Sequence, residues 1–368
     1  MLTNKGRIWS VCLVAACIFM FFFSGLTKAE GAEPRKPEYV IRMHHGLPVG
    51  HYLDKAHKLF AEKVADKSKG RVRIDIYPAA QLYNDVTAVQ AVMSGAIECV
   101  WDYDHKFFTV CPAWGAIGMP GQGIGAGGDD LRKSVEAMHD AFYEGRGPGA
   151  LLSEELEAIG IHLNHFIYWS MPMGMASKKT PVIKPEDLKG RKIRVTTQGE
   201  AKMFHSVGAQ AVSLTGAELY EAMARGTINT GPFPIVHLEE RKLKEIVDYA
   251  VFPVFPTACV GAVVFNLKYW NSLPKDVQQM IEEAGREADR EIRGQLPDSE
   301  AIYRKQMEEA GKIKFIDLTP AQQKPWMDLW QKYGMLAVKD LGTDAIEMWN
   351  SCQDFKKELG IEPFPKIE

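Results

Sequence analysis

The chain has 368 residues, with 44 Lys and Arg against 47 Asp and Glu, so its formal net charge is −3. Removing residues 1–29 would take away Lys5, Arg7 and Lys28 and no acid, which changes the charge to −6. Such an acidic chain is not expected to bind nucleic acid, because that binding depends on Lys and Arg neutralising phosphates. The remaining length of about 340 residues exceeds one compact core, so we expect two lobes.

Residues 1–29 have the layout of a secretory signal peptide. Lys5 and Arg7 precede an apolar run over residues 8–26, and small residues stand at −3 and −1 of a cleavage site after Ala29. The run is also long enough for an uncleaved membrane anchor, and residues 14–17 (VAAC) resemble a lipoprotein box. The rest of the chain is expected to be exported to the periplasm and to be soluble, since no other apolar run reaches about 18 residues.

The first half of the chain alternates strands and helices. Strand patterns lie over residues 39–45, 71–78 and 96–102. Apolar residues at helical spacing predict the intervening helices, over 52–69 and 86–94. Gly70 and Gly95 end these helices. The order strand, helix, strand, helix, strand implies a mostly parallel sheet.

A second block repeats this plan. Strands are predicted over residues 160–169, 191–197 and 209–214. Thr215 and Glu218 have the spacing of a capping box for a helix that ends at Gly226. The pattern of residues 91–98 (AVMSGAIE) recurs 131 residues later in 222–229 (AMARGTIN), which suggests the same helix–glycine–strand unit in each lobe.

The last third begins with a strand over residues 259–266 and continues as a long helical stretch over 274–311. Its glycines and its proline, at Gly285, Gly294 and Pro297, are expected to bend or interrupt it. Another helix begins at Thr319, followed by Pro320 at its first position. Its apolar stripe is predicted to be a packed core face, formed by Trp326, Leu329, Trp330, Tyr333 and Leu336.

No motif in the chain pairs a nucleophile with a base. Residues 123–128 (GIGAGG) match G-x-G-x-x-G formally, but they do not follow a core strand, so a loop is predicted rather than a dinucleotide site. His162 and His165 lie on opposite faces of one strand and cannot share a metal from there. We therefore expect no catalytic residue.

Two further groups of residues leave alternatives open. Asp102, Asp104 and His105 could bind a small cation or form a solvated turn. Four cysteines follow residue 29, and their spacing does not select a pairing; disulfides and isolated buried thiols are both compatible with Cys99, Cys111, Cys259 and Cys352.

Residues 192–197 (KIRVTT) alternate apolar and polar side chains, which predicts a half-buried strand with Ile193 and Val195 on its buried face. Arg194 then lies on the other face, where it must be solvated, paired within the protein, or available to a ligand. In open α/β sheets, ligands bind beyond the carboxyl ends of strands. Side chains at such positions are His44, His45, Trp101, Asp102, Tyr103, Trp169, Arg194 and Phe233.

A pocket that binds an organic anion is expected to be lined by aromatic side chains and to contain a cationic group. Trp101 and Phe233 have an alternative role as core residues, and His44 as a surface residue. An exported chain with two lobes and no catalytic motif is thus expected to capture a ligand rather than to transform it.

Several stretches resemble the DctP-type solute-binding proteins of TRAP transporters, the tripartite ATP-independent periplasmic carriers of organic acids. They are residues 60–82, 89–98, 184–195 (KPEDLKGRKIRV), 216–229 (GAELYEAMARGTIN) and 265–284. The resemblance extends from about residue 38 to about residue 340. It implies an α/β, two-lobed, periplasmic-binding-protein-like fold with mostly parallel sheets, hinge strands and a long connecting helix.

The implied division places residues 38–168 and 259–296 in lobe I, and residues 169–258 and 297–368 in lobe II. The carboxylate-binding arginine of the family falls on Arg194, whose guanidinium can donate two parallel hydrogen bonds to a carboxylate.

Two departures from the family pattern concern the ligand. Many relatives place a second polar or cationic contact about 21 residues before the arginine, where this chain has Met173. A related branch binds α-keto acids with a metal ion through an acid–tryptophan pair, but Pro232 and Phe233 stand at those positions here. Proline has no side-chain oxygen to coordinate an ion. The resemblance therefore implies a monocarboxylate with an apolar or aromatic body, and neither metal nor cofactor.

The ligand-binding residues expected on these grounds are Arg194, Trp169, Met173, Trp101, Tyr103, Phe233 and His45. The expected function is a periplasmic receptor that delivers an organic acid to the membrane permease subunits of a TRAP transporter. A secreted enzyme on a similar two-lobed scaffold and the binding subunit of an ATP-driven importer are the alternatives.

Overall fold

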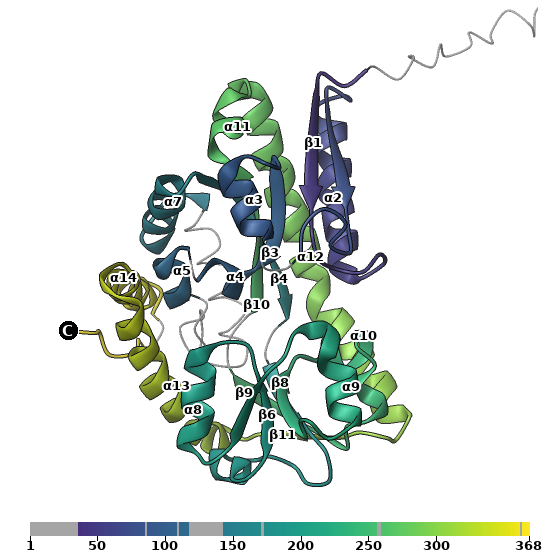
Figure 1. Cartoon of the computed structure of the whole chain (residues 1–368), viewed down its shortest axis with the longest axis vertical. Coiled ribbons are helices and arrows are strands. Elements are labelled where there is room, and N and C mark those ends of the chain that lie inside the picture. Colours follow the sequence, from purple (N-terminus) through teal and green to yellow (C-terminus); the bar gives the residue numbers. More distant parts are fainter. Residues whose placement is uncertain are drawn as a thin grey trace, which may run out of the picture.

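The computed structural model describes residues 36–84, 87–108, 110–117, 143–170, 173–255, 259–360 and 363–368. The chain folds into two α/β lobes, one above the other in Figure 1, each built on its own sheet. The expected two-lobed fold is confirmed. The signal-peptide prediction and the glycine-rich residues 123–128 lie outside the described residues.

The sheet of lobe I has the strand order β2-β1-β3-β10-β4. In that order the strands are β2 (Val72–Tyr77), β1 (Tyr39–His44), β3 (Cys99–Tyr103), β10 (Cys259–Asn266) and β4 (Ile161–Ser170). β1 pairs in parallel with β2 and β3, whereas β10 pairs antiparallel with β3 and β4. Its helices are α2 (Tyr52–Lys67), α3 (Ala88–Ser94), α4 (Asp104–Phe107), α5 (Pro112–Ile117), α7 (Pro148–Ala158) and α11 (Leu267–Ser272).

The sheet of lobe II has the order β11-β9-β5-β8-β6-β7. Its strands are β11 (Lys314–Asp317), β9 (Tyr249–Phe255), β5 (Met173–Ser177), β8 (Thr230–Phe233), β6 (Lys192–Val195) and β7 (Gln210–Ser213). β6 runs parallel to β7 and β8, but β5 is antiparallel to β8 and β9. The helical segments are η1 (Pro185–Leu188), α8 (Gln198–Ser206), η2 (Gly216–Glu218), α9 (Leu219–Ala224), α10 (Ile235–Glu240) and η3 (Leu243–Glu245).

Both sheets are mixed, so the expectation of mostly parallel sheets needs a correction. The antiparallel pairs all involve β10 or β5, and the chain changes lobe between β4 and β5 and again between β9 and β10. β5 and β10 each enter a sheet directly after a strand of the other lobe, and each runs against the direction of its neighbours. The alternation of strands and helices in the sequence does not show the direction in which β5 and β10 run in their sheets.

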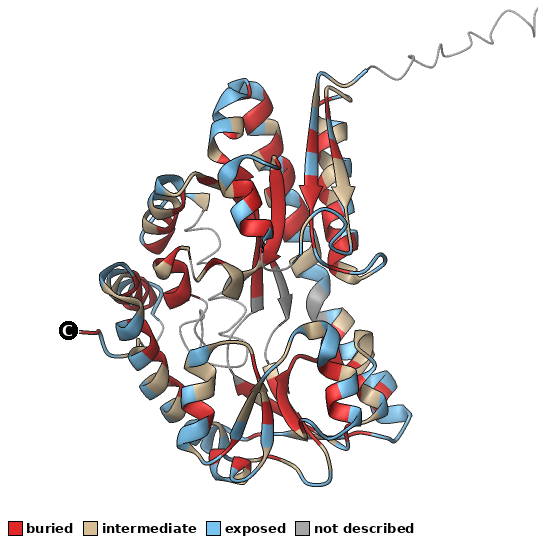
Figure 2. Cartoon of the chain, viewed as in Figure 1, coloured by how far each residue is buried: buried red, intermediate tan, exposed pale blue. Residues whose placement is uncertain are grey.

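Alternating strand residues fill the two faces of each sheet. In β10, Ala262 and Val264 pack in one core cluster of lobe I, and Val263 and Phe265 pack in the other. The period of two follows from the pleat, which turns successive side chains to opposite faces. Buried residues therefore run along the strands and under the helices, as the red segments of Figure 2 show.

The long helix α12 (Lys275–Glu309) passes from lobe I towards lobe II as one helix and packs on α2, β4 and α10. The glycines and the proline do not interrupt it. At Gly285 the absence of a side chain lets α12 lie directly on β4, because a Cβ there would be 2.5 Å from Nδ1 of His165.

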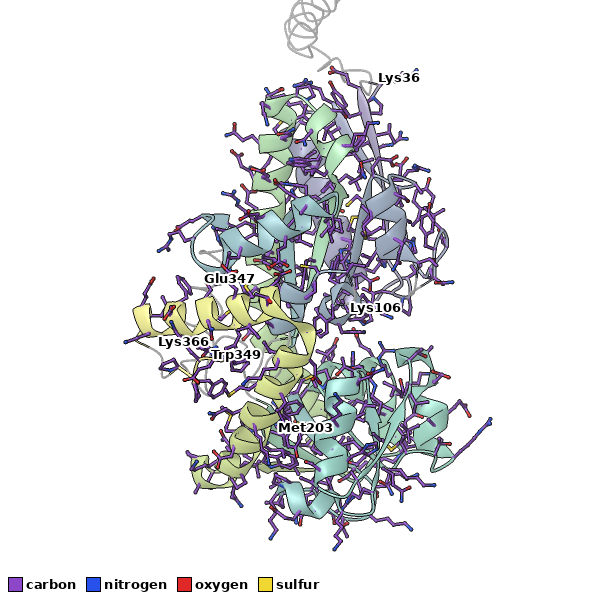
Figure 3. All side chains as sticks on the ribbon, turned by 60° about the vertical axis from the view of Figure 1, so that its left-hand side comes forward. Lys36, Lys106, Met203, Glu347, Trp349 and Lys366 are labelled. Carbon is purple, nitrogen blue, oxygen red and sulfur yellow. The ribbon has the colours of Figure 1, made fainter. Side chains whose placement is uncertain are left out.

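The C-terminal helices join the two lobes. α13 (Pro320–Leu341) places Trp326 and Trp330 in the core of lobe II, as the apolar stripe predicts. α14 (Thr343–Glu358) instead places Trp349 and Phe355 in a core cluster of lobe I with Trp114. The assignment of all of residues 297–368 to lobe II is thus wrong for α14, whose Trp349 is labelled in Figure 3. An apolar stripe does not specify which lobe it meets.

Candidate functional site

Arg194 lies in the middle of β6, and its side chain is half-buried. Ile193 and Val195 on either side are buried in the core of lobe II, as the alternation predicts. The Nε of Arg194 donates a hydrogen bond to the carbonyl oxygen of Leu214 at 3.3 Å. This contact holds the guanidinium beside the loop that follows β7.

Three segments meet at the carboxyl edge of the sheet in lobe II because β6, β7 and β8 are parallel. After β6, a capping box starts α8: Thr196 and Thr197 donate their backbone N–H groups to Oε2 of Glu200, at 2.6 and 3.2 Å. After β7 comes the loop of residues 214–216, and after β8 the chain enters α10. This edge is where open α/β folds bind their ligands.

A buried histidine marks the same edge. His237 on α10 is buried, and burial lowers its pKa well below the ordinary value. The charges of Arg241, Arg194 and His51 lower that pKa further, so all three groups are close enough to affect it. His237 is therefore a neutral group within a cationic region.

Arg241 is a second guanidinium at this edge, and it was missed by the sequence analysis. A Cβ on Gly216 would lie 2.7 Å from both Nη atoms of Arg241, so the guanidinium packs directly on that glycine. Its Nε is buried without a hydrogen-bond partner, and among the described residues its side chain forms no ion pair. The spacing of four residues from His237, just after the β8 strand end, is the only signal that could have found it.

Met173 is the first residue of β5 and is half-buried. It packs against a core cluster of lobe I and also against a core cluster of lobe II. It therefore lies at the junction of the lobes. The side chain of Trp169, at the end of β4, lies outside the described part of the chain.

Three of the expected ligand-binding residues lie inside the lobes. Trp101 is 1% exposed in the core of lobe I, and Phe233 is 0% exposed in the core of lobe II. His45 is also fully buried, with Nε2 3.3 Å from Oδ1 of Asp54, and burial lowers its pKa to about 4. Their role as ligand-binding residues stays a prediction, and the structure shows their side chains buried. Sequence alternation cannot distinguish core from cleft at the end of a strand.

Tyr103 ends β3 and remains half-buried. Its ring meets Trp101 edge-on at 4.9 Å between centroids and stacks on His105 at 5.5 Å. Asp102, for which a cation site was one alternative, accepts a hydrogen bond from the backbone N–H of Tyr103 at 2.8 Å. Across the described residues, no three His, Cys, Asp or Glu side chains gather in a way that could hold a metal ion.

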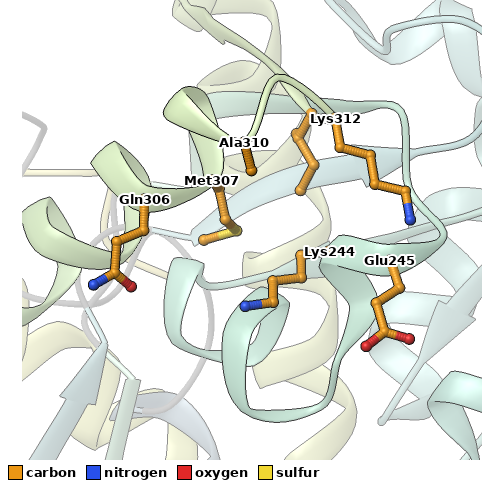
Figure 4. Close-up of a pocket in the computed structure, with 7 residues that line it drawn as sticks. Lys244, Glu245, Gln306, Met307, Ala310 and Lys312 are labelled. Atoms are coloured by element: carbon orange, nitrogen blue, oxygen red, sulfur yellow. The ribbon is translucent and has the colours of Figure 1, made fainter.

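One surface hollow lies away from this edge. This pocket of about 140 Å³ lies between η3 and the end of α12. Figure 4 shows four of the side chains that line it, Met307, Lys244, Glu245 and Lys312. None of its lining residues comes from the ends of β6, β7 or β8. It is therefore distinct from the site around Arg194.

Two further findings concern the state of the cysteines and the hydropathy of the helices. Cys99, Cys111 and Cys352 are free, buried thiols, and burial raises the pKa of the last two to about 12. The side chain of Cys259 is not described. Within the described ranges, every helix is too short or too polar to cross a bilayer.

The chain thus has two α/β lobes, with Arg194 half-buried on β6 of lobe II. The chain belongs to the DctP family of bacterial extracellular solute-binding proteins, family 7, whose model matches residues 43–334. The family resemblance found in the sequence is thereby confirmed. A member of this family is a binding protein and not an enzyme.

Known relatives cover most of the chain. The C4-dicarboxylate-binding periplasmic protein DctP of Rhodobacter capsulatus is 26% identical over 83% of this chain and 89% of its own length. A monocarboxylate 2-oxoacid-binding periplasmic protein of Nostoc is 25% identical over 81% of this chain and 79% of its own. A TRAP periplasmic solute-binding protein of Rhodoferax ferrireducens, solved with bound malonate, has a TM-score of 0.76 at 22% identity, covering 87% of this chain and 99% of that one.

Proposed function

We propose that this chain is an exported receptor that captures an organic acid between its lobes and delivers it to the permease of a TRAP transporter. The observation that carries the proposal is the position of Arg194, half-buried on β6 beside the loop after β7. A guanidinium presents five N–H donors in a planar fork, and a carboxylate accepts two of them in parallel. Residues 1–29 would direct the export.

The finer part of the proposal is that the ligand is a monocarboxylate with an apolar or aromatic body. Met173 supplies a polarisable apolar surface where many relatives place a polar contact, and Tyr103 supplies a half-buried ring. A second carboxylate buried without a cation would cost several kcal/mol. Trp101 and Phe233 are buried in the cores, so the support for this part comes from Met173 and Tyr103.

A dicarboxylate is the second candidate, and Arg241 favours it. The guanidinium of Arg241 lies on Gly216, two residues beyond the carbonyl that holds Arg194. Two cations near one short loop could each bind one carboxylate of the same molecule. The dicarboxylate-binding relative and the malonate-bound structure are compatible with this candidate.

Calorimetric titration with succinate, butyrate and benzoate, each with and without a chelator, separates the candidates. The monocarboxylate proposal predicts saturable binding of benzoate or butyrate, weak or absent succinate binding, and no effect of the chelator. Tight binding of succinate would contradict the monocarboxylate proposal and support the dicarboxylate candidate. Loss of all binding in the chelator would show that a metal takes part.

The partner is tested separately. Adjacent genes for a small and a large membrane subunit, without an ATPase, would support delivery to a TRAP permease. An adjacent ATPase gene would favour an ATP-driven importer instead.

A further inference from the structure

A short contact joins the two lobes at the start of α2. His51, the residue before α2 in lobe I, places Nε2 2.6 Å from Oε2 of Glu240, the last residue of α10 in lobe II. The two side chains are only 9% and 16% exposed. A contact that excludes water on both sides is worth more than an exposed ion pair.

The geometry explains how the carboxylate is held. The backbone N–H of Tyr52 donates to Oε1 of Glu240 at 3.3 Å, and Nδ1 of His51 accepts from the backbone N–H of Leu53 at 3.2 Å. Since Nδ1 is an acceptor, the proton of a neutral His51 is on Nε2, beside Glu240. The imidazole and the carboxylate are in direct contact, with 2.6 Å between Nε2 and Oε2.

The position on the helix adds to this attraction. α2 has sixteen residues, and its N-terminal N–H groups carry partial positive charge. The carboxylate of Glu240 thus meets a histidine and a helix N-terminus together. The neighbouring carboxylate, Glu239, forms an ion pair with Lys244 at 2.5 Å. Glu240 instead contacts His51 of lobe I.

We propose that Glu240 is a positioning residue that fixes α2 and the loop before it against α10 in the binding-competent arrangement of the lobes. The proposal rests on the proposed receptor function. His237 and Arg241, which flank Glu240 on and after α10, belong to the edge that carries Arg194. Ligand-free molecules would exchange between latched and unlatched arrangements, and ligand would favour the latched one.

The first test needs no ligand. Small-angle scattering compares the wild type with Glu240→Ala, His51→Ala, the double variant and Glu240→Gln. Both single alanine variants should have a larger radius of gyration than the wild type, and the double variant should add little, because the pair acts as a unit. Glu240→Gln keeps an acceptor oxygen for Tyr52 and should lie between the wild type and Glu240→Ala.

Glu221→Ala serves as the matched control. Glu221 is a carboxylate of lobe II that, among the described residues, pairs with Arg225 at the end of its own helix α9, and its side chain is 65% exposed. This variant should scatter as the wild type does. Equal radii of gyration for the wild type, Glu240→Ala and His51→Ala would overturn the proposal.

The second test uses succinate, butyrate and benzoate as probes. Whichever of them binds the wild type should bind Glu240→Ala at least about tenfold more weakly, and Glu240→Gln should recover part of the loss. Unchanged affinity would overturn the positioning role. If none of the three probes binds the wild type, the receptor proposal is what fails, and the scattering comparison still decides the role of Glu240.

Discussion

Arg194 carries the central prediction at the scale of single residues. Arg194→Ala should weaken binding of the ligand by at least about tenfold, roughly 1.4 kcal/mol, because the carboxylate loses its charged partner. Arg194→Lys should also bind more weakly, since an ammonium cannot reproduce the planar fork of the guanidinium. Calorimetry measures the affinity, and circular dichroism checks that the variants fold.

Lys192→Ala is the matched control for Arg194. Lys192 lies two residues earlier on the same face of β6, is exposed, and should leave the affinity unchanged when it is removed. Full affinity in Arg194→Ala, or an equal loss in Lys192→Ala, would move the anion site elsewhere.

Arg241 separates the two ligand classes. If the ligand is a monocarboxylate, Arg241→Ala should leave its affinity within about twofold, since no second charge needs a partner. If succinate is the ligand, the same variant should lose at least about tenfold, which corresponds to roughly 1.4 kcal/mol. Titrating one variant with benzoate and succinate gives both answers.

Single residues also show where the sequence was informative. The alternation of residues 192–197 placed Arg194 opposite a buried face, and the structure agrees. The same alternation does not show whether Trp101 and Phe233 line a cleft or fill a core. Aromatic side chains are suited to both environments. Arg241 belongs to no motif, and only the packing on Gly216 brings it near Arg194.

At the scale of elements, α12 offers a matched pair of glycines. Gly285→Ala would place a Cβ 2.5 Å from Nδ1 of His165 and 2.7 Å from Oδ1 of Asn164, so it should destabilise the fold by about 1–3 kcal/mol. Gly294 in the same helix has nothing within 4 Å of such a Cβ, and Gly294→Ala should stabilise by roughly 0.5–1 kcal/mol.

Urea denaturation measures both variants. Helix propensity alone predicts the same stabilising change at the two sites, so only contact with β4 can give them opposite signs. Two stabilising changes would mean that α12 does not lie on β4 at Gly285.

Some elements were predictable because their signals are local. The capping box of Thr215 forms as expected, with the backbone N–H and the hydroxyl both donating to Oε2 of Glu218 at 2.8 and 2.7 Å. The continuity of α12 was not predictable, because Gly285 weakens a helix in isolation but is required where the helix crosses β4. Tertiary packing decides such positions.

At the scale of the molecule, buried neutral histidines make stability depend on pH. Burial is the largest cause that lowers the pKa of four histidines: to about 4 for His45 and His162, and well below the ordinary value for His57 and His237. The unfolded chain binds these protons near pH 6.5, and the folded chain does not. Stability is therefore full above about pH 6.5 and is lost as the pH falls towards 4.

The slope of the free energy of unfolding reaches at most about 5.4 kcal/mol per pH unit if all four histidines titrate together, at about 1.36 kcal/mol each. Burial raises the pKa of Glu155 and Glu282, which opposes part of this loss. Urea midpoints between pH 7.5 and 4.5 should fall steadily, and His45→Gln should reduce the slope. A flat profile would contradict the burial of these rings.

The number of lobes was predictable from length and from the repeated strand–helix pattern, but their boundaries were not. α14 packs with Trp114 of lobe I, although α13 just before it packs in lobe II. Which lobe an apolar helix face meets depends on distant residues that a single sequence does not pair.

Small-angle scattering during titration with a carboxylate that binds tests most directly whether this chain is a receptor that closes on its ligand. The account predicts that the radius of gyration falls and saturates with the binding curve from calorimetry, because ligand favours the closed arrangement. It also predicts that Arg194→Ala needs a higher ligand concentration for the same change. A radius of gyration that stays constant at saturation would contradict it.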